Sequence, residues 1–238
     1  MQRIQVLVCL LVATIILTSC QKLIGEGPVV NETRTTPNFS GVLFKIPGTL
    51  YYIEGAVYKV ELQSQQNILD EIETIMSGTG LVIRFKHSNT RLKSGEDIVV
   101  NITAPALTKL EVHGSGDIQA QSSFDPASLR LLVSGSGNIH VADVVTNSMD
   151  AGISGSGRII VGDGATGNQS LEISGSGEMD FGNLVAQHAD SHISGSGTMK
   201  LSADQTLDVK ISGSGSVRYR GNPVVTSSIS GSGSVSKW

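Results

Sequence analysis

Serine is a reactive side chain that this sequence repeats in a fixed context, since Gly-Ser-Gly occurs seven times between residues 114 and 233. A serine becomes a nucleophile in the Gly-x-Ser-x-Gly elbow, which needs a glycine two residues on either side of it. Around Ser154, Gly152 stands on one side, but Ser156 takes the place of the second glycine. No copy satisfies the elbow pattern, and one reaction centre does not need seven nearly equivalent serines. We therefore predict that the repeated serines are not catalytic.

The histidines and carboxylates also lack the spacing of a metal or catalytic site. His188 and His192 are four residues apart, which would form a metal-binding pair only on a helix, and their segment is predicted as strand and turn. Calcium-binding β-rolls need a carboxylate in every repeat, whereas the residue after the motif changes from Asp117 to Arg158 to Ser216. We predict no catalytic residue, no metal site and no cofactor.

Cys20 is the residue for which the sequence predicts a covalent modification. An apolar run from Val6 to Leu17 precedes it; this run is shorter than the about 20 residues that span a bilayer and is typical of a signal peptide. It ends in Leu17-Thr18-Ser19-Cys20, which resembles the bacterial lipobox. The resemblance implies a signal peptide over residues 1–19 and acylation of Cys20, for example with palmitate, as a membrane anchor. The alternative is an ordinary secretory signal.

The residues around the cysteine set further expectations. Cys9 is the only other cysteine and would leave with the signal peptide, so no disulfide is expected. Residues 20–38 lack periodicity, which predicts a flexible tether before a domain over residues 39–238. Gln21, rather than Asp, follows Cys20. In Gram-negative bacteria this favours sorting of a lipoprotein to the outer membrane. Because the formal net charge is −4 and no basic run is apparent, no nucleic-acid partner is expected.

The spacing of the motif indicates the architecture. The first glycines of the seven copies are separated by 21, 20, 20, 20, 18 and 18 residues. A fixed period near 20 is typical of a solenoid, and it is too short for helical repeats of about 33 residues or more. Ile173, Gly175, Gly177 and Met179 alternate with polar residues, which is the pattern of a strand. We predict an all-β fold, a parallel β-helix with about 20 residues per coil.

In such a stack, each repeat position forms a column. We expect an inward apolar ladder made of Ile118, Ile139, Ile159, Met179, Met199, Val217 and Val235. The glycines share its parity, so they would lie where no Cβ fits or where the backbone needs a positive φ. The serines would point outward as columns of hydroxyls. The predicted structural glycines are Gly114, Gly116, Gly135, Gly137, Gly155, Gly157, Gly175, Gly177, Gly195, Gly197, Gly213, Gly215, Gly231 and Gly233.

Residues 39–110 alternate apolar and polar residues strongly, but we expect less regular coils there than in the motif-containing residues 111–238. The stretch from Gln65 to Met76 fits a short helix, with Ile68, Ile72 and Ile75 at helical spacing. A looser extended coil fits it equally well.

A family resemblance rests on the opening Phe-x-Ile-type strands, on Thr-x-Pro-x-Leu leading into Val112–Ile118, and on the serial Ile-Ser-Gly-Ser-Gly copies. Together these resemble the putative auto-transporter adhesin, head GIN domain family over about residues 39–238. The resemblance implies a parallel β-helix in a bacterial envelope protein, and it assigns no reaction.

Three functions remain open from the sequence. The first is a lipid-anchored, non-enzymatic adhesin or scaffold in the envelope, which binds a glycan or a protein through its hydroxyl-rich face. The second is a polysaccharide-active enzyme, which a groove with two or three carboxylates and an Arg or Lys would favour. The third is a purely structural envelope protein. We also predict that Trp238 folds over the open end of the core with Tyr219; an uncovered end would favour end-to-end self-association.

Overall fold

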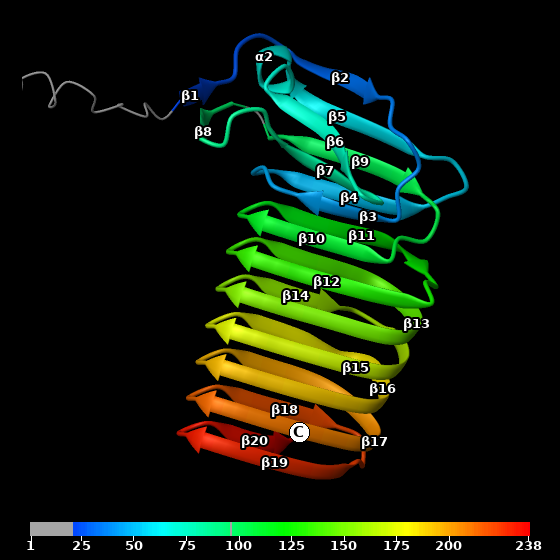
Figure 1. The fold of residues 1–238 in the computed structure, drawn as a ribbon, viewed down its shortest axis with the longest axis vertical. Helices are drawn as coiled ribbons and strands as arrows, with labels where there is room; N and C mark the ends of the chain where they lie inside the picture. Colours follow the sequence, from blue (N-terminus) through cyan, green and yellow to red (C-terminus); the bar gives the residue numbers. More distant parts are fainter. Residues whose placement is uncertain (1–20, 96) are drawn as a thin grey trace, which may run out of the picture.

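The computed structural model describes residues 21–95 and 97–238 and shows one elongated stack of strands (Figure 1). Strands make up 72% of the protein and helix 2%, and the strands form a solenoid of about six turns, roughly 20 residues apart. The predicted all-β parallel solenoid is therefore confirmed. Cys20, its lipobox and the predicted signal peptide lie outside the described residues. Within residues 21–95 and 97–238, no helix is long and apolar enough to cross a membrane.

Residues 109–237 form the regular part of the stack. Its strands are β10 (Lys109–Gly114), β11 (Asp117–Phe124), β12 (Ser128–Gly135), β13 (Asn138–Gly155), β14 (Arg158–Val161), β15 (Gly164–Gly175), β16 (Glu178–Gly195), β17 (Thr198–Gly213), β18 (Ser216–Arg220), β19 (Val224–Gly231) and β20 (Ser234–Lys237). All their pairings with one another are parallel, and the motif stays in register: Ile153 pairs with Ile173, which pairs with Ile193. Sequence positions one period apart are therefore neighbours in space.

The strand alternation sorts side chains into a core and a charged surface. Six members of the predicted ladder, from Ile118 to Val217, are buried, and Val235 in the last coil is partly buried. Outward charges pair between neighbouring coils: Arg158 Nη2 lies 2.7 Å from Glu178 Oε2, and Lys200 Nζ lies 2.9 Å from Asp180 Oδ2. Because side chains at equivalent positions are stacked about 4.8 Å apart, opposite charges at these two pairs of positions attract each other.

The N-terminal part combines the solenoid with antiparallel strands. Its elements are β1 (Gln21–Ile24), β2 (Val29–Arg34), β3 (Gly41–Phe44), β4 (Thr49–Glu54), β5 (Lys59–Gln65), α2 (Gln66–Leu69), β6 (Ile72–Ser77), β7 (Gly80–Phe85), β8 (Thr90–Ser94) and β9 (Val99–Ala104). β3 and β4 continue the stack, since they pair in parallel with β10 and β11. β5 pairs antiparallel with β9 and β2, and β6 pairs antiparallel with β7. The antiparallel strands β2, β5, β6, β7 and β9 cover the end of the stack opposite β20 (Figure 1).

The predicted flexible tether over residues 20–38 is wrong for much of that segment. β1 pairs in parallel with β8, and β2 pairs antiparallel with β5. Leu23 is only 8% exposed, and β2 alternates between exposed and partly buried side chains. The sequence does not reveal these strands because they are short edge strands, and their partners lie 26 or more residues further along the chain. The ordered domain therefore includes β1 and β2, before residue 39.

The segment from Gln65 to Met76 is not one helix. α2 is a single turn, and β6 begins three residues after it ends. A helix would place Ile68, Ile72 and Ile75 on one buried face. Ile68 and Ile72 are buried, but Ile75 is 36% exposed. β6 pairs along its whole length with β7, so tertiary pairing overrides a weak helical pattern.

Tyr52 links the coils of the N-terminal part. Its hydroxyl accepts a hydrogen bond from the Leu107 backbone N–H at 3.2 Å and donates one to the Pro105 carbonyl at 3.0 Å. The ring packs edge-to-face on Phe124, with 5.4 Å between ring centroids. Burial raises the pKa of Tyr52 to about 12, because the phenolate would lose its water in this position.

Trp238 does not cover the end of the core as predicted. Its backbone N–H donates to the Tyr219 carbonyl at 3.1 Å, and its ring lies 4.7 Å from the guanidinium of Arg220. Lys237 pairs with Tyr219, whose side chain packs against the core, so the next residue points outward by strand alternation. The indole therefore lies on the flank of the stack. Val225 and Ile229 in β19 stay 37% and 42% exposed.

Candidate functional site

The two glycines of each motif have different structural roles. Gly175 has a φ of +125°, and a Cβ at this position would lie 2.5 Å from the carbonyl oxygen of Gly155 in the preceding coil. That same oxygen accepts a hydrogen bond from the Ser176 N–H at 2.9 Å. Gly177 is buried, and its Cβ would lie 2.6 Å from Ile153 Cγ2. The first glycine permits the turn, and the second permits close stacking of the coils.

The serines occupy the opposite parity and reach solvent. From β12 to β19, the first serine of each motif is exposed, and successive members pair in register. This serine column consists of Ser134, Ser154, Ser174, Ser194, Ser212 and Ser230. Within residues 21–95 and 97–238, their hydroxyls make no side-chain hydrogen bond. They are therefore available to a ligand.

A shallow groove of about 260 Å³ lies beside this column. We call it the serine groove; it is lined by His113, Leu132, Val133, Ser134, Gly152, Ile153, Ser154, Glu172 and Ser174. Gly152 lies between Leu132 and Glu172 in one outward column. Its missing side chain leaves room for Leu132, whose Cδ2 would be 2.8 Å from a Cβ at position 152. The groove thus combines an apolar surface with exposed hydroxyls, a carboxylate and an imidazole.

A second depression, of about 330 Å³, adjoins the groove on the same sheet. Its walls include Glu172, Asp190 and Asp208, together with His192 and Lys210. Lys210 Nζ lies 4.0 Å from Asp208 Oδ1. This is the combination of carboxylates and a cation that the enzyme alternative requires. In the described part of the chain, no group of three or more His, Cys, Asp or Glu side chains is placed to hold a metal ion.

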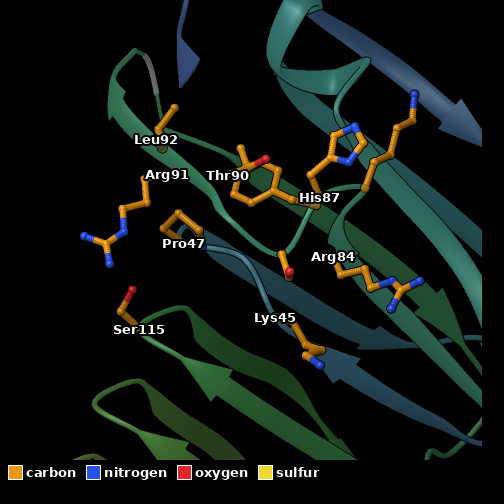
Figure 2. Close-up of a pocket in the computed structure, with 11 residues that line it drawn as sticks. Lys45, Pro47, Arg84, His87, Thr90, Arg91, Leu92 and Ser115 are labelled. Atoms are coloured by element: carbon orange, nitrogen blue, oxygen red, sulfur yellow. The ribbon is translucent and has the colours of Figure 1, made fainter. Parts of the chain in front are cut away.

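A third pocket, of about 630 Å³ and larger than the other two, lies in the N-terminal part and was not predicted (Figure 2). We call it the basic pocket, because Lys45, Arg84, Lys86 and Arg91 line it. The sequence carried a signal: residues 84–93, RFKHSNTRLK, contain four of the 17 lysines and arginines and no acidic residue. The overall negative charge concealed this short basic segment, so the expectation of no basic run is wrong.

The two histidines that are four residues apart lie in strand β16, not on a helix. His188 and His192 are both exposed, and His188 Nδ1 lies 2.9 Å from Thr206 Oγ1. The structure gathers the predicted serines and glycines into columns along one edge of the stack. Cys20, Leu17, Thr18 and Ser19 lie outside the described residues.

Comparisons with known proteins agree with this architecture. A putative adhesin from Bacteroides fragilis is 20% identical, with a TM-score of 0.86 over 91% of this chain and 100% of that chain. A putative lipid binding protein from Parabacteroides distasonis is 23% identical, with a TM-score of 0.72 over 92% and 100%. A putative adhesin from Parabacteroides merdae is 17% identical, with a TM-score of 0.73 over 92% and 99%. At these identities the likeness shows the fold.

No curated protein matches the sequence. The family model described as putative auto-transporter adhesin, head GIN domain matches residues 38–223, which is most of the chain. The chain therefore belongs to this family and is an adhesin-like protein of the cell envelope.

Proposed function

We propose that this protein is a lipid-anchored, non-enzymatic adhesin that binds a glycan, or a glycan-bearing envelope protein, through the serine column and the serine groove. The observation that carries the proposal is the row of exposed hydroxyls without side-chain partners beside the apolar surface of Leu132. Sugar rings present hydroxyls at their edges and C–H groups on their faces, so a groove of this mixed character suits them.

Repetition supports binding to an extended ligand. The serine column repeats at the spacing of neighbouring strands, about 4.8 Å, so a chain-like glycan can contact several coils at once. Each contact is weak, but linked contacts raise the overall affinity because later ones form at high effective concentration. A single small substrate would gain nothing from this repetition.

The environment of the serines supports a non-enzymatic role. A serine nucleophile needs a base within hydrogen-bond reach, and in the described residues no histidine or carboxylate hydrogen-bonds a serine of the column. The depression with Glu172, Asp190 and Asp208 is the observation that favours the enzyme alternative. Incubation of bound polysaccharides with the full chain distinguishes the two, since an enzyme would shorten them and Asp190→Asn would abolish the shortening.

A glycan array probed with the full chain in neutral detergent tests the binding role. We expect retention of a restricted set of glycans, and loss of that binding when Leu132→Asp places a charge on the apolar surface. An unchanged melting temperature shows that the variant is folded. Failure of the wild-type chain to bind any glycan or envelope protein would remove the proposal.

Acylation of Cys20 completes the proposed function. Metabolic labelling with a clickable fatty acid should mark the wild-type protein and leave Cys20→Ala unmarked. Equal labelling of both would contradict the anchor. Since β1 begins at Gln21, directly after the cysteine, the anchor would hold the N-terminal part at the membrane and leave the serine column to extend away from it (Figure 1).

A further inference from the structure

The basic pocket lies where the chain leaves the main sheet, between β7 and β8. The Thr90 N–H donates to the His87 carbonyl at 3.1 Å, which closes a turn between β7 and β8. β8 then pairs with β1 in a separate two-stranded sheet. Figure 2 shows Arg91 on one side of the resulting pocket, with Arg84 and His87 on the opposite side. Ser115, from the first copy of the motif, lies below Arg91 in this view.

The pocket carries uncompensated positive charge. Its described walls contain no Asp or Glu. Arg84 is paired, since its Nε lies 2.6 Å from Glu73 Oε1. Lys45, Lys86 and Arg91 are exposed and form no ion pair with any described residue. In a protein with a net charge of −4, three unpaired cations around one pocket indicate an anionic ligand.

The pocket wall also holds a polar group without a partner. Thr90 is 9% exposed, and among the described residues its Oγ1 has no hydrogen-bond partner. A buried hydroxyl in this state is unfavourable unless something else satisfies it. Its position at the start of β8, beside Arg91, places it in the pocket wall.

The position of the pocket relative to Cys20 indicates the source of the anion. Lys22 pairs with Arg91, and Gln21 pairs with Thr90, so the pocket wall is directly beside the first residues after the cysteine. Consecutive Cα atoms are about 3.8 Å apart, and neighbouring strands about 4.8 Å. The headgroup layer is itself roughly 5–8 Å thick on each side of a bilayer. An acylated Cys20 would therefore bring Lys22, Arg91 and the pocket to the headgroups.

We propose that the basic pocket binds the phosphate-bearing headgroup of an anionic lipid in the membrane that holds the anchor. This inference rests on the acylation of Cys20 in the proposed function, and it concerns a surface separate from the serine groove. One acyl chain gives only marginal membrane binding, and a basic patch is a common second contribution. The pocket would also fix how the solenoid stands on the membrane, because it lies to one side of the anchor.

Vesicle co-sedimentation of the full chain carrying Cys20→Ser tests the pocket without any contribution from the acyl chain. We expect about tenfold stronger partition onto phosphatidylcholine vesicles containing phosphatidylglycerol than onto phosphatidylcholine alone. Added salt should weaken this binding, because it screens the attraction. Since the variant cannot be acylated, the result is independent of whether Cys20 carries a lipid in the wild type.

Two double variants separate the pocket from general charge. Lys86→Gln with Arg91→Gln should reduce binding to the anionic vesicles to nearly the level of neutral vesicles. Arg158→Gln with Arg218→Gln removes the same charge from the repeat coils and should leave binding unchanged. Melting temperatures establish that both proteins are folded.

Three results would overturn the proposal. Equal binding to neutral and anionic vesicles would show that headgroup charge is not recognised. Equal losses in both double variants would assign the attraction to net charge. Binding of inorganic phosphate or of an acidic oligosaccharide in solution, without binding to anionic vesicles, would assign the pocket to a soluble anion instead.

Discussion

Residues 111–238 stack parallel strands with the motif in one register, whereas residues 21–110 add antiparallel strands and a separate two-stranded sheet. The regular half yields long columns and shallow grooves of about 260 and 330 Å³. The irregular half yields a pocket of about 630 Å³ and covers one end of the core. In this molecule strict repetition produces a uniform surface, and the larger pocket lies where β8 pairs with β1 outside the main sheet.

The largest expected effect concerns the repeat half, where coils approach most closely. Gly177→Val should destabilise the protein by about 2–3 kcal/mol, because even a Cβ there would lie 2.6 Å from Ile153 Cγ2 and 2.9 Å from the Gly157 carbonyl oxygen. Thermal or urea unfolding measures the loss. By contrast, a Cβ added to Gly78, in the hairpin between β6 and β7, would meet no atom within 4 Å, so only its φ of +59° resists substitution.

The matched control for this change is its neighbour in the motif. Ser176→Ala should change stability by less than about 0.5 kcal/mol, because the serine side chain is exposed. A larger loss for Ser176→Ala than for Gly177→Val would mean that the two faces of the motif are inverted.

A somewhat smaller effect is expected in the N-terminal half, where the Tyr52 hydroxyl joins β4 to the segment that follows β9. Tyr52→Phe should cost about 1–3 kcal/mol, because the buried Leu107 N–H and Pro105 carbonyl lose their partner. No loss in denaturant unfolding would show that this hydroxyl does not hold the coils together.

The same residue predicts a pH dependence. With a pKa of about 12 in the folded protein against 10.0 ordinarily, Tyr52 keeps its proton where the unfolded chain loses it. Its contribution is therefore full below pH 10 and is lost as the pH rises to about 12. The difference in stability between wild type and Tyr52→Phe should narrow over this range. A constant difference would contradict the assignment.

An effect of opposite sign is expected inside the repeat core. Gln169 is 2% exposed, and its Oε1 and Nε2 have no hydrogen-bond partner among the described residues. It stands in a column whose previous member is Met149. Gln169→Met should therefore stabilise the protein by about 1 kcal/mol, seen as a higher melting temperature. A lower melting temperature would indicate that a water molecule satisfies the amide.

The predictability of the two halves differs for a physical reason. The period and alternation of the motif predicted the stack, its inward ladder from Ile118 to Val217 and its exposed serines, because equivalent positions meet in space. The strands β1 and β2 could not be found from local pattern, since each depends on a partner far along the chain. Trp238 was mispredicted because strand parity, rather than its apolar area, determines where it lies.

The candidate surfaces follow the same division. The serine column was visible in the sequence, but the groove beside it depends on Gly152 standing between Leu132 and Glu172, three residues that are 20 apart. The basic pocket unites Lys45 and Ser115 with residues 84–92, and only the fold brings these segments together. The basic composition of residues 84–93 was the one available signal.

We assign each motif two roles: its glycines allow the coils to stack, and its serines bind the ligand. The most direct test compares wild type with Ser134→Ala/Ser154→Ala/Ser174→Ala on one glycan array, with melting temperatures measured in parallel. This division of roles predicts melting temperatures within about 2 °C of each other and a clear loss of glycan binding by the triple variant. Unchanged binding, or a melting temperature lowered by more than about 8 °C, would contradict it.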